Sequence, residues 1–289
     1  MREVSPTELN PMPEPVRLPR LTVVIPSFQQ GKFIERTIRS IVDQAYPNLE
    51  LILMDGGSTD ETMEIVGRYA GHFAHISSGP DGGQASAIKK GFEIATGDFI
   101  SWLNSDDTYN DGALLVVGTY LAGHPEVQFV YGNTNIIDAD DTVVAFKRSA
   151  TFVLGVMKYA FLTVPQMSAF WSRNLYTAVG GVDAKLRFCM DYDLFVRMAT
   201  RTAPMRIHCT IGNFRIHPSS KTTTLESVRL AEDTLVHERY CSIKPTSKLS
   251  FAVVRSFYMS VLVGLFFING SLFDRVSRRM QNSMKSECS

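Results

Sequence analysis

Short apolar runs alternate with segments of helical periodicity in the first hundred residues of the chain. The runs are rich in Val, Ile, Leu and Phe and lie at residues 21–26, 49–54, 73–76 and 99–103. Such runs are typical of strands that are buried on both faces of a sheet. Between them, apolar residues recur at three- and four-residue intervals, as on one face of a helix. This alternation predicts an α/β fold with a mostly parallel central sheet and flanking helices.

Polar residues follow each of these four predicted strands. Right-handed connections bring the carboxyl ends of parallel strands to one edge of a sheet, where ligands bind in such folds. The polar residues expected at that edge are Ser27, Asp55, Asp81, Gln84, Asp106 and Asp107. The sequence therefore predicts a ligand site along this edge.

The pattern changes in the second half of the chain. Further short strands are predicted at residues 129–133, 135–137, 143–147 and 168–171. The polar run between the second and third of these is typical of a turn between antiparallel strands. One helix is expected from Arg173 to a stop at Gly180, and another begins near Asp191.

Composition removes several classes of protein. The chain has 289 residues with 29 basic and 29 acidic side chains, so it lacks the strongly basic footprint of a nucleic-acid-binding protein. Four cysteines without a C-x-x-C pair indicate free thiols rather than a disulfide framework or a structural zinc site. The first twenty residues contain five prolines and predict an irregular leader at 1–20, neither a signal peptide nor a membrane anchor.

The C-terminal region combines positive charge with apolar residues. After Tyr240 there are seven basic and two acidic side chains, and residues 249–268 form a largely apolar segment. This combination predicts peripheral contact with an anionic membrane surface. Arg255 interrupts the segment, and a single crossing from the cytoplasm would export the basic residues that follow it, so spanning is disfavoured. The alternatives are a solvated basic helix and a helix that covers the core.

The stretch Asn104-Ser105-Asp106-Asp107 carries the strongest candidate chemistry. Two adjacent carboxylates and an amide directly after a buried strand supply the hard oxygen ligands that Mg²⁺ or Mn²⁺ prefers. A bound cation of this kind neutralises charge on a departing diphosphate. The alternative is a polar turn that caps the helix predicted at residues 111–124.

The order of these and other motifs resembles the family 2 glycosyltransferases, which are inverting enzymes with a GT-A fold. The matching stretches are residues 23–28, 40–44, 53–60, 81–84, 97–107, 165–171, 179–183, 190–197, 214–217 and 220–222. The resemblance implies a glycosyltransferase domain at 21–222, with a nucleotide-sugar half at 21–110, an acceptor half at 111–222 and a helical tail at 223–289. It also implies a nucleotide-diphospho sugar donor, most simply a UDP-sugar, and a saccharide or lipid-linked acceptor.

The resemblance assigns donor-binding roles to individual positions. Pro26 and Ser27 are expected to line the nucleoside pocket, and Asp55 to bind the base, unless it is only a turn residue. Gln84 is expected near the diphosphate or ribose, with a solvent-facing position as the alternative. Asp107 and Lys221 complete the expected donor site, where the Lys221 ammonium closes over the phosphates as a point charge.

The metal site departs from the family pattern at one position. Asp106 occupies the second acidic position of the D-x-D motif, but Asn104 replaces the first aspartate. The resemblance makes Asp106 the main ligand of Mn²⁺ or Mg²⁺, with Asn104 a weaker candidate. His217 either completes the metal shell or contacts the diphosphate, with an ordinary hydrogen-bonding histidine as the alternative.

An inverting transfer also needs a general base for the acceptor hydroxyl. Asp191 matches the family's base position, and Asp193 is the competing carboxylate, expected to pair with Arg197 one turn along the helix. Both aspartates are alternatively N-terminal residues favoured by the helix dipole. Gln166 and Trp171 are expected to flank the acceptor, with core packing the open alternative for Trp171.

These expectations combine into one predicted function. The chain is expected to be a metal-dependent inverting glycosyltransferase of polysaccharide or glycolipid assembly, cytoplasmic and at the inner face of the cell membrane. A sugar-1-phosphate nucleotidyltransferase is a poorer match, because the loop after the first strand is not an Arg-bearing Gly-rich loop. The other alternative is a nucleotide-sugar-binding protein without turnover, against which the presence of both Asp106 and Asp191 argues.

Overall fold

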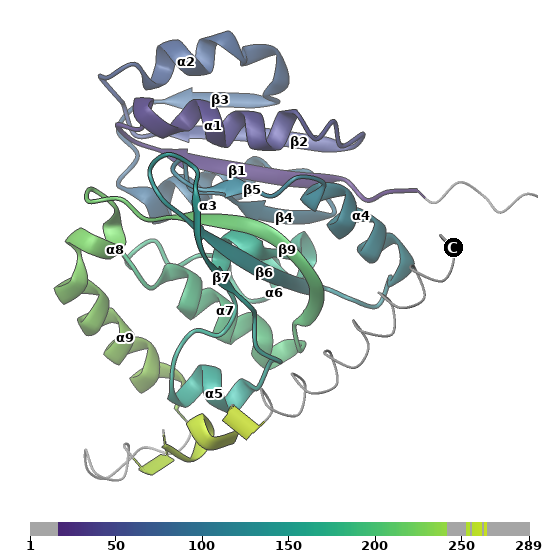
Figure 1. Ribbon diagram of the computed structural model, residues 1–289, viewed down its shortest axis with the longest axis vertical. Coiled ribbons are helices and arrows are strands. Elements are labelled where there is room, and N and C mark those ends of the chain that lie inside the picture. The colour runs from purple at the N-terminus through teal and green to yellow at the C-terminus, as the bar shows by residue number, and fades with distance from the viewer. Residues whose placement is uncertain (1–16, 242–252, 255, 262, 265–289) are drawn as a thin grey trace, which may run out of the picture.

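The computed structural model describes residues 17–241, 253–254, 256–261 and 263–264. Within these residues a curled sheet of nine strands forms the centre of the molecule (Figure 1). Its first part is parallel throughout, in the order β3-β2-β1-β4. These strands are β1 (Leu21–Ser27), β2 (Leu49–Asp55), β3 (His75–Ser78) and β4 (Phe99–Trp102). The predicted parallel sheet is confirmed.

Helices cover both faces of the sheet, which explains the apolar runs of the sequence. One layer contains α1 (Gly31–Val42), α2 (Thr62–Arg68), the short η1 (Ala70–His72) and α4 (Ala113–Gly123); the other contains α3 (Gln84–Ile94), α6 (Arg173–Ala178) and α7 (Met190–Arg201). Along β1, Val23 packs with Ile38 of α1, whereas Val24 packs with Ile88 of α3. Successive strand residues therefore enter opposite cores.

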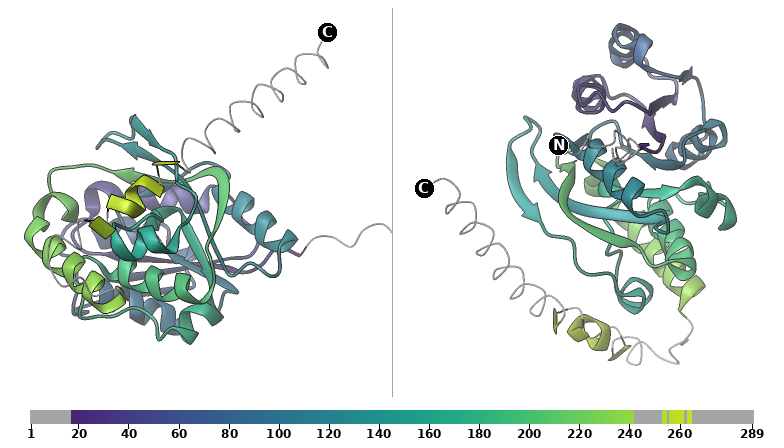
Figure 2. Two further views of the ribbon diagram at one scale, coloured as in Figure 1. Left: turned by 90° about the horizontal axis from the view of Figure 1, so that it is seen from below. Right: turned by 90° about the vertical axis from the view of Figure 1, so that its right-hand side faces the viewer.

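The second half of the chain extends the same sheet with mixed strand directions. Its strands are β5 (Thr108–Tyr109), β6 (Phe129–Ile137), β7 (Val143–Lys147), β8 (Ala169–Ser172) and β9 (Met205–Arg215). The expected antiparallel hairpin is confirmed as β6 and β7, which extends from the sheet edge in Figure 2. The two strands expected at 129–133 and 135–137 are instead one continuous strand, and β6 pairs in parallel with β9, which the hydrophobic pattern did not indicate.

Of the remaining elements, two helices pack against α7 and one short 3-10 turn packs against the sheet. They are α5 (Leu154–Tyr159), η2 (Gln166–Ser168), α8 (Lys221–Thr224) and α9 (Glu226–Tyr240). Helix α9 belongs to the region expected as a tail, yet its Val236 is buried in the same core as α7. It therefore packs as part of the folded body.

Half of the apolar segment 249–268, and residues 1–16 of the expected leader, lie outside the described residues. The described parts of that segment are helical, and the Tyr258 ring stacks on Tyr159 of α5 with 5.1 Å between centroids. Nowhere in the described part of the chain is there a helix with the length and apolar content to cross a membrane.

Candidate active site

The carboxyl ends of β1 and β2 place two predicted donor-binding residues side by side. Ser27 pairs with Asp55 in the parallel register, directly after Pro26 pairs with Met54. Ser27 is 5% exposed, and its Oγ has no hydrogen-bond partner in the structure. A buried hydroxyl without a partner costs free energy in the absence of a ligand, so Ser27 is a candidate contact at this edge.

Asp55 organises the loop that follows β2. Its carboxylate accepts hydrogen bonds from the backbone N–H groups of Gly57 and Ser58, at 3.0 and 2.9 Å. The hydroxyls of Ser58 and Ser78 donate to the same carboxylate at 2.5 and 2.6 Å. Asp55 therefore stabilises the turn after β2, as the alternative for this residue proposed. A nucleobase that bound Asp55 would have to share or displace these hydrogen-bond donors.

An exposed aromatic residue stands beside this loop. Phe28 is 58% exposed, and its ring and the Asp81 carboxylate both border the space that a side chain at Gly56 would occupy. Asp81 also accepts from the Gly83 N–H at 2.6 Å, which fixes the start of α3. Phe28 received no individual role from the sequence, although its position after the first strand was the available signal.

The loop after β4 gives its two adjacent carboxylates, the predicted metal ligand Asp106 and the predicted donor-binding residue Asp107, different surroundings. Asp107 is buried, and its carboxylate accepts from the backbone N–H of Arg215 at 2.9 Å and from the Asn104 side chain at 3.1 Å. Burial, together with the neighbouring charge of Asp106, raises the pKa of Asp107 well above its ordinary value. Asp107 therefore serves the loop's internal structure.

Asp106 faces the opposite way and meets His217. Asp106 Oδ2 and His217 Nε2 are 3.0 Å apart, although the residues are 111 positions apart in the sequence. The other ring nitrogen of His217 lies 2.9 Å from Ser219 Oγ, and its ring packs on Phe33 of α1. A carboxylate and an imidazole that converge in this way fit a divalent cation whose remaining ligands come from a diphosphate.

No larger cluster of ligands forms around this pair. In the part of the chain that the structure describes, no three His, Cys, Asp or Glu side chains gather at a metal-binding distance. Asn104 turns away from Asp106, because its Oδ1 accepts from Gln84 at 2.8 Å and its amide donates to Asp107. Only Asp106 and His217 of the three predicted ligands are brought together.

Lys221 links the start of α3 to the segment before α7. Its Nζ donates to Gln84 Oε1 at 2.5 Å and to the carbonyl of Arg187 at 3.3 Å. Desolvation and the charge of Arg187 lower the pKa of Lys221, while Asp106 and Asp191 oppose this effect. Lys221 thus lies within electrostatic reach of both the predicted metal ligand and the predicted base.

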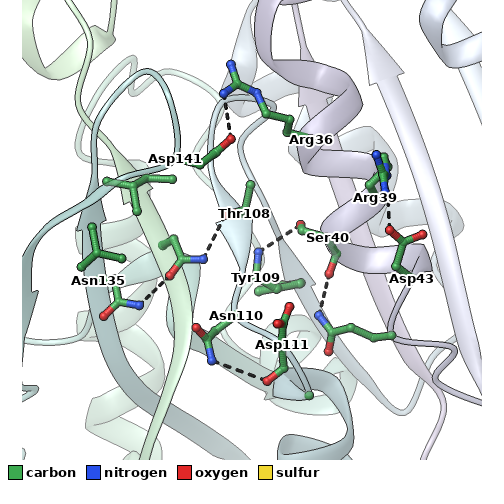
Figure 3. Close-up of a pocket in the computed structure, with 15 residues that line it drawn as sticks. Arg36, Arg39, Ser40, Asp43, Thr108, Tyr109, Asn110, Asp111, Asn135 and Asp141 are labelled. Atoms are coloured by element: carbon green, nitrogen blue, oxygen red, sulfur yellow. Dashed lines mark hydrogen bonds and ion pairs between the residues drawn. The ribbon is translucent and has the colours of Figure 1, made fainter.

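Arg215 joins the acidic loop to the β6–β7 hairpin. Its guanidinium is completely buried and donates to the Asp106 carbonyl at 2.6 Å and to Asp141 at 2.5 Å. Asp141 also pairs with Arg36 of α1 at 2.7 Å, as Figure 3 shows. The sequence pattern gave no role to Arg215, yet its guanidinium lies 5.1 Å from the centroid of the Phe33 ring, which also packs on His217.

Behind this ion pair lies an open polar groove of about 630 Å³ between α1 and the strands β5, β6 and β9 (Figure 3). Arg36, Ser40 and Asn213 are among its lining residues. Most of its polar groups bond to one another, as in the contacts of Asn213 with Thr108 and of Asn135 with Asn213. The groove does not include Asp106, His217 or Asp191.

Asp191 lies in the first turn of α7, and its environment differs from that of Asp193. Burial raises the pKa of Asp191 to about 6; the charge of Glu232 adds to this effect, and backbone hydrogen bonds and Lys221 oppose it. Such a carboxylate is poised to exchange a proton near neutral pH.

Asp193 is instead a structural hub. It is 1% exposed and pairs with Arg197 at 2.6 Å, which confirms the expected contact one turn along the helix. It also accepts from Arg239 at 3.0 Å and from the Tyr240 hydroxyl at 2.7 Å, both on α9.

The two expected acceptor residues lie in different surroundings. Gln166 is 5% exposed, donates to the Trp102 carbonyl at 2.6 Å and lies 3.5 Å from the Asn104 amide, so it supports the floor of the site. Trp171 is 0% exposed, and its ring meets Trp102 and Phe195 edge-on in the core. Core packing, the alternative for Trp171, therefore accounts for its position, and no face of its ring is open to a sugar.

Comparison with known proteins decides the family. The profile described as glycosyl transferase family 2 matches residues 22–170, which is more than half of the chain. The chain belongs to this family. The glycosyltransferase is 26% identical over 189 residues to the PGL/p-HBAD biosynthesis glycosyltransferase of Mycobacterium bovis, a match that covers 64% of this chain and 72% of that protein.

Two solved structures share its fold. S. aureus TarS 1-349 in complex with UDP superposes with a TM-score of 0.61 at 14% identity, covering 83% of this glycosyltransferase and 70% of that chain. The mannosyltransferase PcManGT from Pyrobaculum calidifontis, in complex with GDP-Man and Mn²⁺, gives 0.57 at 19% identity, covering 85% and 70%. A longer TarS chain also matches, of which this chain spans 39%. The GT-A fold expected from the resemblance is thereby confirmed.

Proposed function

We propose that this glycosyltransferase moves a sugar, with inversion, from a nucleotide-diphospho sugar to a hydroxyl of a saccharide or lipid-linked acceptor. The observation that carries the proposal is the convergence of Asp106 and His217, together with Lys221, whose ammonium interacts electrostatically with both Asp106 and the buried carboxylate of Asp191. A diphosphate held at Asp106 and His217 and a hydroxyl at Asp191 would place the anomeric carbon between them, as in-line displacement requires.

Each side of the site contributes a distinct function in this proposal. Asp106 and His217 hold Mn²⁺ or Mg²⁺, which when bound neutralises charge on the leaving diphosphate. Ser27 and Phe28 contact the nucleoside, while Asp55 keeps the loop beneath the base in place. Asp191 accepts the proton of the attacking hydroxyl, so the acceptor oxygen forms the new glycosidic bond as the bond from sugar to diphosphate breaks.

The donor is inferred to be a UDP-sugar, with GDP-sugars as the competing class. TarS was solved with UDP and with UDP-GlcNAc, and PcManGT with GDP-Man, so the fold accommodates both nucleotides. The domain boundary proposed at residue 222 falls within α8, and α9 lies wholly in the C-terminal region.

The proposed place of action is the cytoplasmic face of a membrane, where nucleotide sugars are available. Exposed apolar side chains support this, because Val253, Phe257 and Val263 are 63%, 62% and 49% exposed. Clustered exposed apolar residues next to basic sequence are typical of interfacial helices.

The test uses the full-length protein with a panel of UDP- and GDP-sugars, a divalent cation and saccharide or lipid-linked acceptors. Acceptor-dependent release of nucleoside diphosphate, with a β-linked product from an α-linked donor, supports the proposal. Pyrophosphate exchange into a sugar-1-phosphate would indicate a nucleotidyltransferase. Donor binding without product under every pairing would indicate a binding protein.

A further inference from the structure

Glu232 of α9 binds the segment that leads into α7. Its carboxylate accepts three backbone hydrogen bonds, from Arg187 at 2.7 Å, Phe188 at 2.8 Å and Cys189 at 2.8 Å. Cys189 is the residue before the first turn of α7, and its side chain does not cap the helix. Glu232 therefore fixes, from another helix, the backbone that leads directly into the first turn of α7.

Helix α9 is itself fixed to α7 at its other end. Asp193 of α7 accepts from Arg239 and Tyr240 of α9, and Val236 between these contacts and Glu232 is 1% exposed. Helix α9 is thus attached to α7 and the segment before it at two places: through Glu232 on one side of the buried Val236 and through Arg239 and Tyr240 on the other. The Glu232 carboxylate therefore has a defined position relative to the first turn of α7.

We propose that Glu232 is a positioning residue of the transfer reaction, which fixes residues 187–189 and thereby holds Asp191 at the acceptor side of the site. The inference rests on the proposed role of Asp191 as the base. It also gives α9 a part in the reaction, although the family profile ends at residue 170 and the sequence placed this helix in a tail.

Glu232 influences Asp191 through its negative charge as well as through its hydrogen bonds to residues 187–189. Burial is the largest cause of the raised pKa of Asp191, and the negative charge of Glu232 raises it further. The titratable and charged groups around Asp191 and the preceding loop are Glu232, Asp233 and Arg229 of α9, Lys221 of α8, and Arg187 and Cys189 of the loop itself. Removal of the Glu232 charge leaves Lys221 less opposed, so the pKa of Asp191 falls.

The decisive variant is Glu232→Gln, which keeps the size of the side chain and one acceptor oxygen but loses the charge. We expect the acid limb of the kcat/KM profile to move to lower pH and kcat to fall about tenfold, the scale of a small misplacement of a reacting group. The KM of the donor should change less than kcat, because Asp106 and His217 are untouched. Glu238→Gln, an exposed residue on the same helix, is the matched control.

A second measurement reports on position independently of turnover. Hydrogen exchange of the backbone amides of residues 187–189 should accelerate at least about tenfold in Glu232→Gln, because each loses part of its acceptor. Glu232→Asp keeps the charge on a shorter side chain, and we expect a lower kcat with the acid limb near its original pH. If Glu232→Gln fails to fold, Glu232→Asp alone decides: wild-type kcat and wild-type exchange in that variant overturn the proposal.

Unchanged exchange and an unmoved acid limb in a folded Glu232→Gln protein would equally show that Glu232 does not position Asp191. Asp191→Asn is measured in parallel to separate this from a failure of the proposed function. If Asp191→Asn retains turnover, the acid limb belongs to another group and the base assignment fails. If Asp191→Asn is inactive and Glu232→Gln is normal, only the role of Glu232 is wrong.

Discussion

Asp106 Oδ2 and His217 Nε2 lie 3.0 Å apart at the end of strands that the sequence separates by 111 residues. Asp106 comes from the loop after β4 and His217 from the residues after β9. Strands β4 and β9 are not neighbours in the sheet. Asp106 and His217 meet because β5, which directly follows the acidic loop, is hydrogen-bonded to β9. The curl of the sheet is therefore what assembles the proposed metal site.

Replacement of Asp106 should abolish the metal-dependent reaction. We expect Asp106→Ala to lower turnover by about a hundredfold or more, because the proposed cation site then loses its main protein ligand. Asn104→Ala should have a milder effect, since the Asn104 amide bonds to Asp107 and Gln84 rather than facing His217. Turnover is measured across a Mn²⁺ titration, with the exposed Glu126→Ala as control. Wild-type activity in Asp106→Ala would remove this residue from the metal site.

The pH dependence of kcat/KM should follow Asp191. Its pKa is raised to about 6, and only the deprotonated carboxylate accepts a proton, so activity should fall as the pH drops through about 6. Asp191→Asn should retain donor binding and lose turnover by about a hundredfold or more, the usual scale for loss of a general base. A pH–rate profile and donor titration by calorimetry check both expectations.

Asp193→Asn is the matched comparison for that experiment. Asp193 is buried with Arg197, Arg239 and Tyr240 around it, so the amide should cost about 2–3 kcal/mol of folding free energy through weakened charged hydrogen bonds. The acid limb of the folded variant should stay where it is. Loss of transfer in Asp193→Asn with normal thermal stability, while Asp191→Asn stays active, would exchange the roles of the two carboxylates.

Arg215 should control metal affinity without binding the metal. Arg215→Lys keeps the positive charge but cannot donate at once to the Asp106 carbonyl, the Asp138 carbonyl and the Asp141 carboxylate. We expect the Mn²⁺ concentration for half-maximal activity to rise by about tenfold or more, the usual range for residues that orient metal ligands. Arg206→Lys on the same strand is the control. An unchanged Mn²⁺ dependence would show that the loop holds its shape without Arg215.

Replacement of Trp171 should distinguish a role in core packing from a role in acceptor binding. Trp171→Phe should lower the free energy of unfolding by about 1–3 kcal/mol, because it removes part of a fully buried ring and leaves a gap beside Phe129 and Phe195. The acceptor KM of the folded protein should be unchanged. Denaturant unfolding and acceptor saturation curves provide the two measurements, and a raised acceptor KM at wild-type stability would restore the acceptor role.

The fold was predictable where one physical rule dominates a segment. Strands buried on both faces have continuous apolar runs, so β1, β2 and β4 were anticipated within one or two residues. Strand β9 begins at Met205, but its first half includes the polar residues Arg206 and His208, so no continuous apolar run marks where it starts. The parallel pairing of β6 and β9 depends on tertiary contacts that no local pattern records.

The site was predictable where the contact is local or where a known family supplies its partner. The pair of Asp193 and Arg197 follows from helix geometry, and the positions of Asp106, Asp191 and His217 came from the family resemblance. Glu232 lies 45 residues from Arg187 and makes its contacts to backbone N–H groups, which leave no mark on the sequence of the loop. The burial of Trp171 depends likewise on rings from distant segments.

Membrane attachment through the C-terminal region remains to be tested, and the described residues offer a way to do it without truncation. Phe257 and Val253 are exposed apolar residues, whereas Tyr258 of the same segment packs on Tyr159. The double variant Val253→Asp and Phe257→Asp should lower co-sedimentation with anionic vesicles by about tenfold or more, because it removes two apolar contacts and adds two repelled charges. Leu230→Asp on α9 introduces one such charge at a residue that is 52% exposed, and it should have little effect. If all three proteins sediment with the vesicles to the same extent, this segment does not contact the membrane.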